Sequence, residues 1–235
     1  MGKKVCVATG CFYKLECSDD YKIDLIKDLD VDGLEITFAS AEEVKKFSLS
    51  EESEAYVKSL SWNSVHAPFK YTFDKSKKSE KIIKLMENIY SKTCSKNLVV
   101  HPDRIDDFSR ILGRGMSVST ENLIRYETNK LEDLLKNHKN LGIVLDLTHA
   151  ACNSLDEIEK LYGLFHDKIT EIHCSAHTDG KRHQLFHKAT EEYLAKSSIV
   201  KSLDVPLVIE LELPEDVTVS VVREEVEFLK KWYFS

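Results

Sequence analysis

The chain has 235 residues, 42% of them hydrophobic, and a formal net charge of −7; this length suits one large domain, and α/β barrels often reach it. It lacks both the apolar run of about 18 residues that a transmembrane helix needs and an N-terminal signal peptide, so we expect a cytoplasmic protein with no membrane partner. The acidic balance, without a block rich in lysine and arginine, weighs against a nucleic-acid partner, because phosphate binding needs a basic surface.

In the first half of the chain, short apolar runs alternate with segments of helical periodicity. The predicted strands are Lys4–Thr9, Gly33–Phe38, Asn63–His66 and Leu98–His101. The predicted helices are Asp19–Leu29, a region in two pieces from Ser40 to Leu60, Lys75–Ser91, and a short crossover of two or three turns within Asp103–Leu112. Ser40 has Glu43 three residues on, which is a capping-box pattern for a helix start.

The second half repeats this alternation. Its predicted strands are Met116–Thr120, Ile143–Leu145, Ile169–Cys174 and Leu207–Leu211. Its predicted helices are Glu127–Lys136, Ser154–Phe165, Lys188–Ser202 and Val219–Trp232, and a long polar loop, 175–187, follows the seventh strand. Eight strand–helix units with near-continuous apolar strands predict a parallel sheet closed into a (β/α)8 TIM barrel, with residues 1–235 as one domain. An open doubly wound sheet is disfavoured, because no GxGxxG loop follows the first strand.

Ionisable side chains stand where these strands should end. In chain order they are His66, His101, Glu121, Asp146, His149, His173 and Glu210. Such groups are costly beside an apolar strand unless something pairs with them, and the carboxyl ends of barrel strands meet at the face that carries active sites. A lone histidine or glutamate here is often a hydrogen-bonded structural residue or a rim charge. The same pattern at six strand ends predicts one shared divalent-metal site.

The ligand types narrow the choice of metal. The last four strands supply an oxygen-rich set, which is Glu121, Asp146, His173 and Glu210. Such a set suits Zn²⁺, Mn²⁺, Co²⁺ or Mg²⁺. His66 and His101 add nitrogen ligands, which favour zinc and leave room for a second metal bridged by Glu121. His149 and His183 could build a third position.

Three further residues each allow two interpretations. Glu35 lies within the second strand, and a buried salt bridge, for example to Lys4, is as good an interpretation as catalysis. Glu212 shares a face with Glu210 by strand alternation, and we favour Glu210 as the ligand because it directly follows the apolar run. Cys11 lies in a polar loop and could be reactive, although an inert thiol is the favoured interpretation.

Six motifs in order, SVHAPF, VVHP, STEN, DLTHA, EIHCSAH and IELE, resemble the xylose isomerase-like TIM-barrel superfamily, which includes the endonuclease IV group. The resemblance covers nearly the whole chain. Its isomerase and epimerase branch implies that the oxygen-rich set holds one divalent metal, which polarises a substrate carbonyl and its neighbouring hydroxyl. In that branch Glu121 and Glu210 would shuttle a proton from opposite faces of the carbon, and His149 would bind a substrate hydroxyl.

The endonuclease IV branch implies three zinc ions, which activate a water to attack a phosphodiester. The first zinc would be held by His66, His101 and Glu121, and the second by the oxygen-rich set. The third would use His149, His183 and an aspartate two residues before His183, where this chain has Lys181. A protonated lysine cannot ligate zinc, so this third set lacks one ligand unless Asp179 substitutes after a loop shift.

Lys181 and Arg182 suit a phosphate or carboxylate on a small substrate, which His183 beside them would also contact. The leading prediction is therefore a divalent-metal-dependent isomerase or epimerase for a sugar or sugar phosphate. The first alternative is an endonuclease IV-like zinc phosphodiesterase for abasic-site DNA, which His66 and His101 favour because a one-metal isomerase needs neither as a ligand. The second alternative is a non-catalytic barrel that binds a small molecule.

Overall fold

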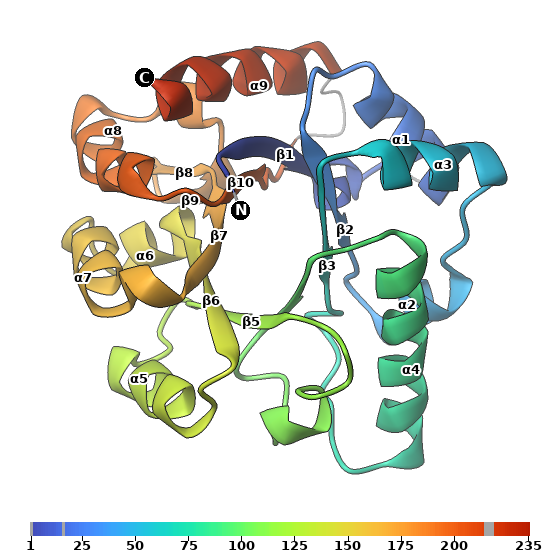
Figure 1. Cartoon of the computed structure of the whole chain (residues 1–235). Helices are drawn as coiled ribbons and strands as arrows, with labels where there is room; N and C mark the ends of the chain where they lie inside the picture. The colour runs from blue at the N-terminus through green and yellow to red at the C-terminus, as the bar shows by residue number, and fades with distance from the viewer. Residues whose placement is uncertain (1, 16, 214–218) are drawn as a thin grey trace.

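The chain closes eight parallel strands into a barrel in the order β1-β10-β7-β6-β5-β4-β3-β2 (Figure 1). A computed structural model describes residues 2–15, 17–213 and 219–235. The barrel strands are β1 Lys4–Ala8, β2 Gly33–Thr37, β3 Trp62–His66, β4 Asn97–Val100, β5 Val118–Glu121, β6 Leu141–Asp146, β7 Ile169–Cys174 and β10 Pro206–Ile209. This closed ring confirms the predicted (β/α)8 barrel.

Helices surround the barrel (Figure 1), and each of them has buried apolar side chains. They are α1 Asp19–Lys27, α2 Ala41–Lys46, α3 Glu51–Ser59, α4 Lys77–Lys92, α5 Thr128–Asn137, α6 Leu147–Asn153, α7 Asp156–Phe165, α8 Glu191–Ser197 and α9 Val219–Phe234. Helix α4 is an example of such a helix. The Ser76 hydroxyl caps its start by accepting from the Ser79 backbone N–H, and Ile82, Ile83 and Met86 are fully buried along one stripe. No helix in the described ranges is long and apolar enough to cross a membrane.

Three connections differ from the predicted ones. Between β4 and β5 the structure has only a 3₁₀ turn, Phe108–Arg110, in place of two or three helical turns. Helix α6 begins directly after β6, because the last residue of that strand, Asp146, is also the N-cap of the helix. The predicted polar loop 175–187 contains a hairpin of β8 Ala176–Thr178 and β9 Lys181–Gln184. Its turn is Asp179-Gly180, and both residues have positive φ, as a two-residue hairpin turn requires.

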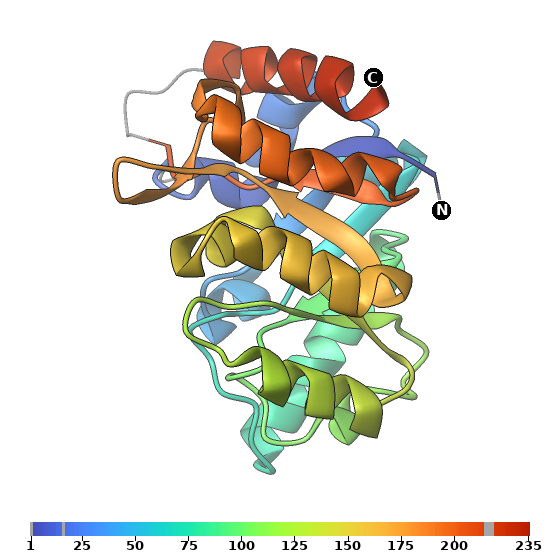
Figure 2. The ribbon, with the colours of Figure 1, turned by 90° about the vertical axis from the view of Figure 1, so that its left-hand side faces the viewer.

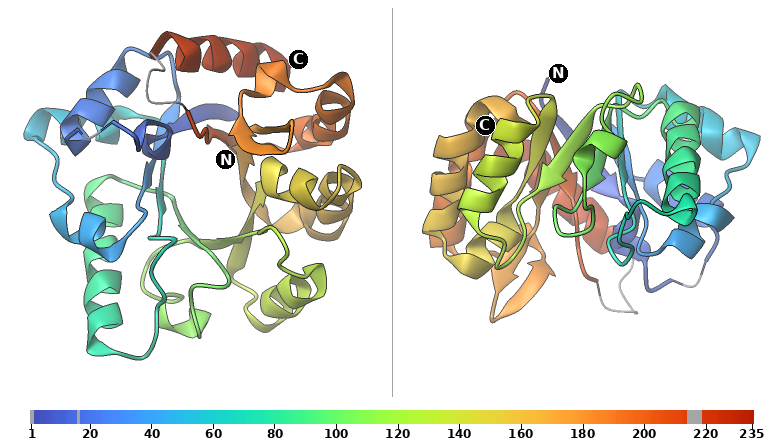
Figure 3. Two further views of the ribbon diagram at one scale, coloured as in Figure 1. Left: turned by 180° about the vertical axis from the view of Figure 1, so that it is seen from behind. Right: turned by 90° about the horizontal axis from the view of Figure 1, so that it is seen from below.

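The two ends of the barrel are different. The β8–β9 hairpin projects from one end, and the two chain termini lie toward the other (Figures 2 and 3). Because β8 directly follows β7, the hairpin marks the end where the strands finish. That end therefore also holds the ionisable strand-end residues.

The close approach of β2 and β3 requires glycine at position 33. A Cβ there would lie 2.0 Å from the Trp62 carbonyl oxygen and 2.9 Å from Cys6 Sγ. We expect Gly33→Ala to destabilise the protein by at least about 2 kcal/mol through overpacking, measured by urea unfolding. Gly163→Ala is the matched control, because Gly163 lies in α7 with open space around it. We expect that variant to be about 0.5–1 kcal/mol more stable, and equal effects of the two substitutions would contradict the argument.

Candidate metal centre

The strand-end side chains converge on the carboxylate of Glu121, the last residue of β5, which is 1% exposed. His66 Nε2 and His101 Nε2 each lie 3.2 Å from Glu121 Oε2. On the other oxygen, Oε1, His149 Nδ1 lies at 2.8 Å. His173 Nδ1 is 3.7 Å from Oε2. Four imidazoles from four different segments thus face one carboxylate.

The same carboxylate belongs to two groups that could each hold a metal ion. The first group is His66, His101 and Glu121, and the second is Glu121, Asp146, His173 and Glu210. Within each group, one donor atom from every residue lies within 4.8 Å of the others. In the second group His173 Nδ1 is 3.2 Å from Glu210 Oε2 and 4.0 Å from Asp146 Oδ2. Glu121 therefore stands where it could bridge two cations.

Local structure explains how these ligands are held. His66 ends β3, and its Nδ1 lies 2.9 Å from the Ala67 carbonyl oxygen, which directs Nε2 toward Glu121. Asp146 is paired in register with His173 on the neighbouring strand. The Asn122 side chain donates to the Asp146 carbonyl at 2.9 Å and accepts from the Asp146 N–H at 2.8 Å. This double hydrogen bond joins the ends of β5 and β6.

Several buried polar atoms in this cluster have no well-directed hydrogen bond. They include Glu121 Oε1, Asp146 Oδ2, His173 Nδ1 and Glu210 Oε2. Buried polar atoms are almost always paired, and each unpaired one costs free energy. These four belong to the four residues of the second group and are of the types that bind Zn²⁺, Mn²⁺, Co²⁺ or Mg²⁺. A divalent cation would satisfy them together and offset the three clustered carboxylates, so the donor set fits a metal.

The carboxylates and imidazoles shift one another's pKa values. Burial opposes ionisation of Glu121, but the neighbouring His101, His149 and His66 imidazoles hold its pKa well below the usual range. Burial likewise opposes charge on His66, but the hydrogen bond with Glu121 and the nearby carboxylates raise its pKa to about 9. For His149 burial is again outweighed, mainly by Asp146 and Glu121, and the pKa rises to about 10. Protons on the histidines thus balance the carboxylates when no cation is bound.

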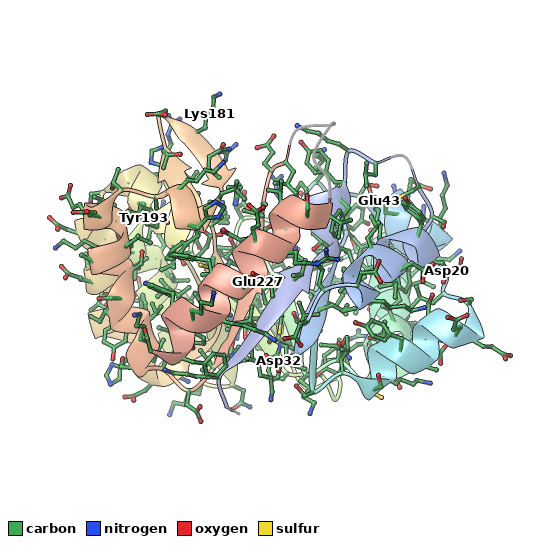
Figure 4. All side chains as sticks on the ribbon, turned by 90° about the horizontal axis from the view of Figure 1, so that it is seen from above. Asp20, Asp32, Glu43, Lys181, Tyr193 and Glu227 are labelled. Atoms are coloured by element: carbon green, nitrogen blue, oxygen red, sulfur yellow. The ribbon has the colours of Figure 1, made fainter. Side chains whose placement is uncertain are left out.

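The hairpin residues predicted to bind substrate fall into two sets. His183 lies beside the cluster, with its ring 5.3 Å from the His149 ring and its Nδ1 3.2 Å from the Ser175 hydroxyl. Lys181 and Arg182 are exposed on β9. Figure 4 shows the Lys181 side chain at the outer tip of the hairpin, pointing away from the body of the protein. Contact of these two cations with a substrate stays a prediction.

Packing decides how Glu35, Glu212 and Cys11 are placed. Of the two interpretations of Glu35, the buried pairing has His173 as its partner rather than Lys4, the example given above. Glu35 is fully buried, and its Oε2 lies 3.4 Å from His173 Nε2. Glu212 is exposed and accepts from the Tyr13 hydroxyl at 3.1 Å, so Glu210 is the residue inside the cluster. Cys11 is buried rather than in a solvated loop, and burial raises its pKa to about 12. A buried thiol with a raised pKa agrees with the favoured interpretation of an inert cysteine.

Sequence reasoning missed three residues at this site. Asn122 couples β5 to β6, as described above. Phe69 stacks on His101 with ring centroids 6.1 Å apart. Glu171 is fully buried in β7, two residues before His173 and on the same face of the strand. Of these three residues, only Glu171 could have been found from the sequence, because it alternates with His173 along the predicted strand.

No protein-family model and no curated protein matches the sequence. Solved structures do match. A D-tagatose 3-epimerase-like protein has a TM-score of 0.70 at 19% identity, over 97% of this chain and 96% of that one. A xylose isomerase domain protein from Alicyclobacillus acidocaldarius subsp. acidocaldarius has a TM-score of 0.65 at 17% identity, over 98% of each chain. Endonuclease IV from Thermus thermophilus has a TM-score of 0.65 at 15% identity, over 99% of this chain and 98% of that one. These likenesses confirm the (β/α)8 barrel fold.

The raised histidine pKa values predict how stability and metal binding vary with pH. Folded-state values of about 9 for His66 and about 10 for His149 lie above the ordinary imidazole value of about 6.5. Their contribution to the stability of the metal-free protein is therefore complete below about pH 6.5 and lost as the pH rises through about 9 to 10. Metal must displace these protons, so its dissociation constant should fall from pH 6 to pH 9.

Titration calorimetry in buffers of different ionisation enthalpy would measure both the affinity and the protons released. Urea unfolding of the metal-free protein at pH 6, 8 and 10 would measure the stability. A metal affinity that does not change with pH, with no proton release, would contradict the protonated cluster.

Proposed function

We propose that the chain is a divalent-metal-dependent isomerase or epimerase acting on a sugar or sugar phosphate. The observation that carries this proposal is a pair of carboxylates, from two different strand ends, beside one imidazole nitrogen. Glu210 Oε2 lies 3.2 Å and Glu121 Oε2 lies 3.7 Å from His173 Nδ1. When bound by these residues, the metal would polarise a substrate carbonyl and the adjacent hydroxyl.

The residues around it would then move a proton. Glu121 and Glu210 come from β5 and from the residue after β10, so they reach the substrate from different sides of the barrel. Burial opposes ionisation of Glu210, but the neighbouring His173 outweighs it and lowers the pKa, and the pKa of Glu121 is also low. Both are therefore ionised near neutral pH and able to accept a proton from carbon. One would remove the proton from one face and the other would return it to the opposite face.

A second candidate function rests on the two additional histidines. His66 and His101 meet the same oxygen of Glu121, which a one-metal isomerase does not require. Two cations bridged by one carboxylate would favour an endonuclease IV-like zinc phosphodiesterase acting on abasic-site DNA. The net charge of −7 and the short β4–β5 connection oppose this, because a DNA duplex needs a basic and extended surface. A small-molecule substrate is therefore the favoured partner.

Metal stoichiometry tests the shared role of Glu121. We expect Glu121→Ala to remove all bound metal, because this residue belongs to both candidate groups. Glu210→Ala should remove only the ion of the second group. Glu212→Ala is the matched control, since Glu212 is an exposed carboxylate two residues along. Elemental analysis of protein purified without added metal or chelator is the measurement, and unchanged metal content in both Glu121 and Glu210 variants would overturn the assignment.

Deuterium exchange tests the reaction class. An isomerase or epimerase of this design would incorporate solvent deuterium at the carbon that loses its proton, when metal-loaded protein is incubated with sugars or sugar phosphates in D₂O. We expect Glu210→Gln to lower this incorporation by about 10²-fold or more, the usual contribution of general acid–base catalysis. Cleavage of abasic-site DNA without any sugar exchange would instead favour the phosphodiesterase. If metal-loaded protein shows neither activity, the remaining interpretation is a non-catalytic barrel that binds a small molecule.

A further inference from the structure

A column of polar side chains runs through the barrel interior behind the metal-binding face of His173. Its members are Glu35, Ser64, Asn97, Ser119 and Glu171, all at most 1% exposed. Barrel interiors are normally filled by branched apolar residues, and a buried carboxylate is costly unless it is paired. Packing of the barrel interior therefore does not explain why these polar residues are there.

His173 lies between this column and the candidate metal centre, with one ring nitrogen facing each. Its Nδ1 faces Glu210 and Glu121, at 3.2 and 3.7 Å. Its Nε2 faces Glu35 Oε2 at 3.4 Å. The ring is fully buried, and in the described structure Nε2 has no well-directed hydrogen bond. Glu35 is thus the carboxylate toward which this nitrogen is aimed.

We propose that Glu35 is a positioning residue, which holds the proton of His173 on Nε2 and so directs the Nδ1 lone pair at the metal. This inference rests on the metal site proposed above. A neutral imidazole has one N–H, and the hydrogen bond made by one nitrogen decides which nitrogen is free to bind a metal. A carboxylate oxygen can accept a hydrogen bond from an imidazole N–H, so with Glu35 Oε2 3.4 Å from Nε2 the proton belongs on Nε2. A carboxylate behind a histidine also makes it a stronger ligand.

His66 provides an internal contrast, because its ring is held the opposite way. Its Nδ1 lies 2.9 Å from the neutral Ala67 carbonyl oxygen, and its Nε2 faces Glu121. The two candidate sites thus differ in their outer support, which is a carbonyl behind His66 and a carboxylate behind His173. We expect the site of His173 to bind a divalent cation more tightly than the site of His66 and His101.

Glu35 is itself held in place by its neighbours. The Ser64 hydroxyl lies 3.3 Å from Glu35 Oε2 and 2.8 Å from Glu171 Oε1, and the Thr37 hydroxyl lies 3.5 Å from Glu35 Oε1. Glu171 also accepts from the Asn97 amide at 2.9 Å. Glu171 thus shares the Ser64 hydroxyl with Glu35, and donor atoms of both carboxylates lie within 4.8 Å of His173. The matched control is therefore Glu225, a fully buried carboxylate on α9 that accepts from the backbone N–H groups of Phe186 and His187.

The test measures zinc affinity by competition with a chelator, for the full chain and three variants. We expect Glu35→Leu to weaken zinc binding at the His173 site by about 10- to 100-fold, the usual effect of removing the outer partner of a metal-bound histidine. Glu35→Gln keeps an acceptor oxygen and should recover most of that loss. Glu225→Gln should stay close to the unmodified protein.

A second readout follows the proton directly. In zinc-loaded protein labelled with ¹⁵N-histidine, NMR should show His173 coordinated through Nδ1 and protonated at Nε2, and His66 the reverse. Coordination of His173 through Nε2 in the unmodified protein would overturn the inference, even if Glu35→Leu does not fold. Equal zinc affinities of folded Glu35→Leu and the unmodified protein would also overturn the inference. A chain that binds none of Zn²⁺, Mn²⁺, Co²⁺ and Mg²⁺ would instead overturn the proposed function.

Discussion

The carboxylate of Glu121 is the group on which the carboxyl-end face of this barrel depends. Imidazoles from β3, the end of β4, α6 and β7 all face it, and they are buried or nearly so. Removing one partner of a buried ion pair leaves an uncompensated charge, which costs more than the pair gains. The ends of four segments are therefore linked through one residue. A cation would take over the role that protons on the histidines have in the metal-free protein.

The barrel itself could be predicted because buried parallel strands have a simple signature, which is a continuous apolar run such as Ile143–Leu145. The convergence of the strand-end residues then followed from topology, since parallel strands finish at one face. The β8–β9 hairpin was missed although its Asp179-Gly180 turn is a strong local signal. The early start of α6 was missed because Asp146 ends a strand and caps a helix at once.

The partner of Glu35 could not be predicted, for a different reason. Strand alternation placed this residue inside the barrel, but its contact with His173 depends on which strands face each other across the interior. The register of β2 and β7 in a closed ring is a tertiary property, and these strands are not neighbours. Lys4 and His173 were equally compatible with the local sequence. Only the closed barrel distinguishes a surface cation from a buried imidazole as the partner.

The polar column has a thermodynamic cost that apolar residues would avoid. Burial, together with the nearby Glu35 carboxylate, raises the pKa of Glu171 to about 7, although Asn97 and Ser64 donate to it. The ionised form of Glu171 is therefore less favourable in the folded protein than in the unfolded chain. As the pH rises from about 4.5 toward 7, its ionisation disfavours folding. Such a cost is consistent with interior residues that serve the site at the carboxyl end of the barrel rather than the stability of the core. Glu171, whose ionisation disfavours folding, belongs to the column behind the histidine that faces the candidate metal.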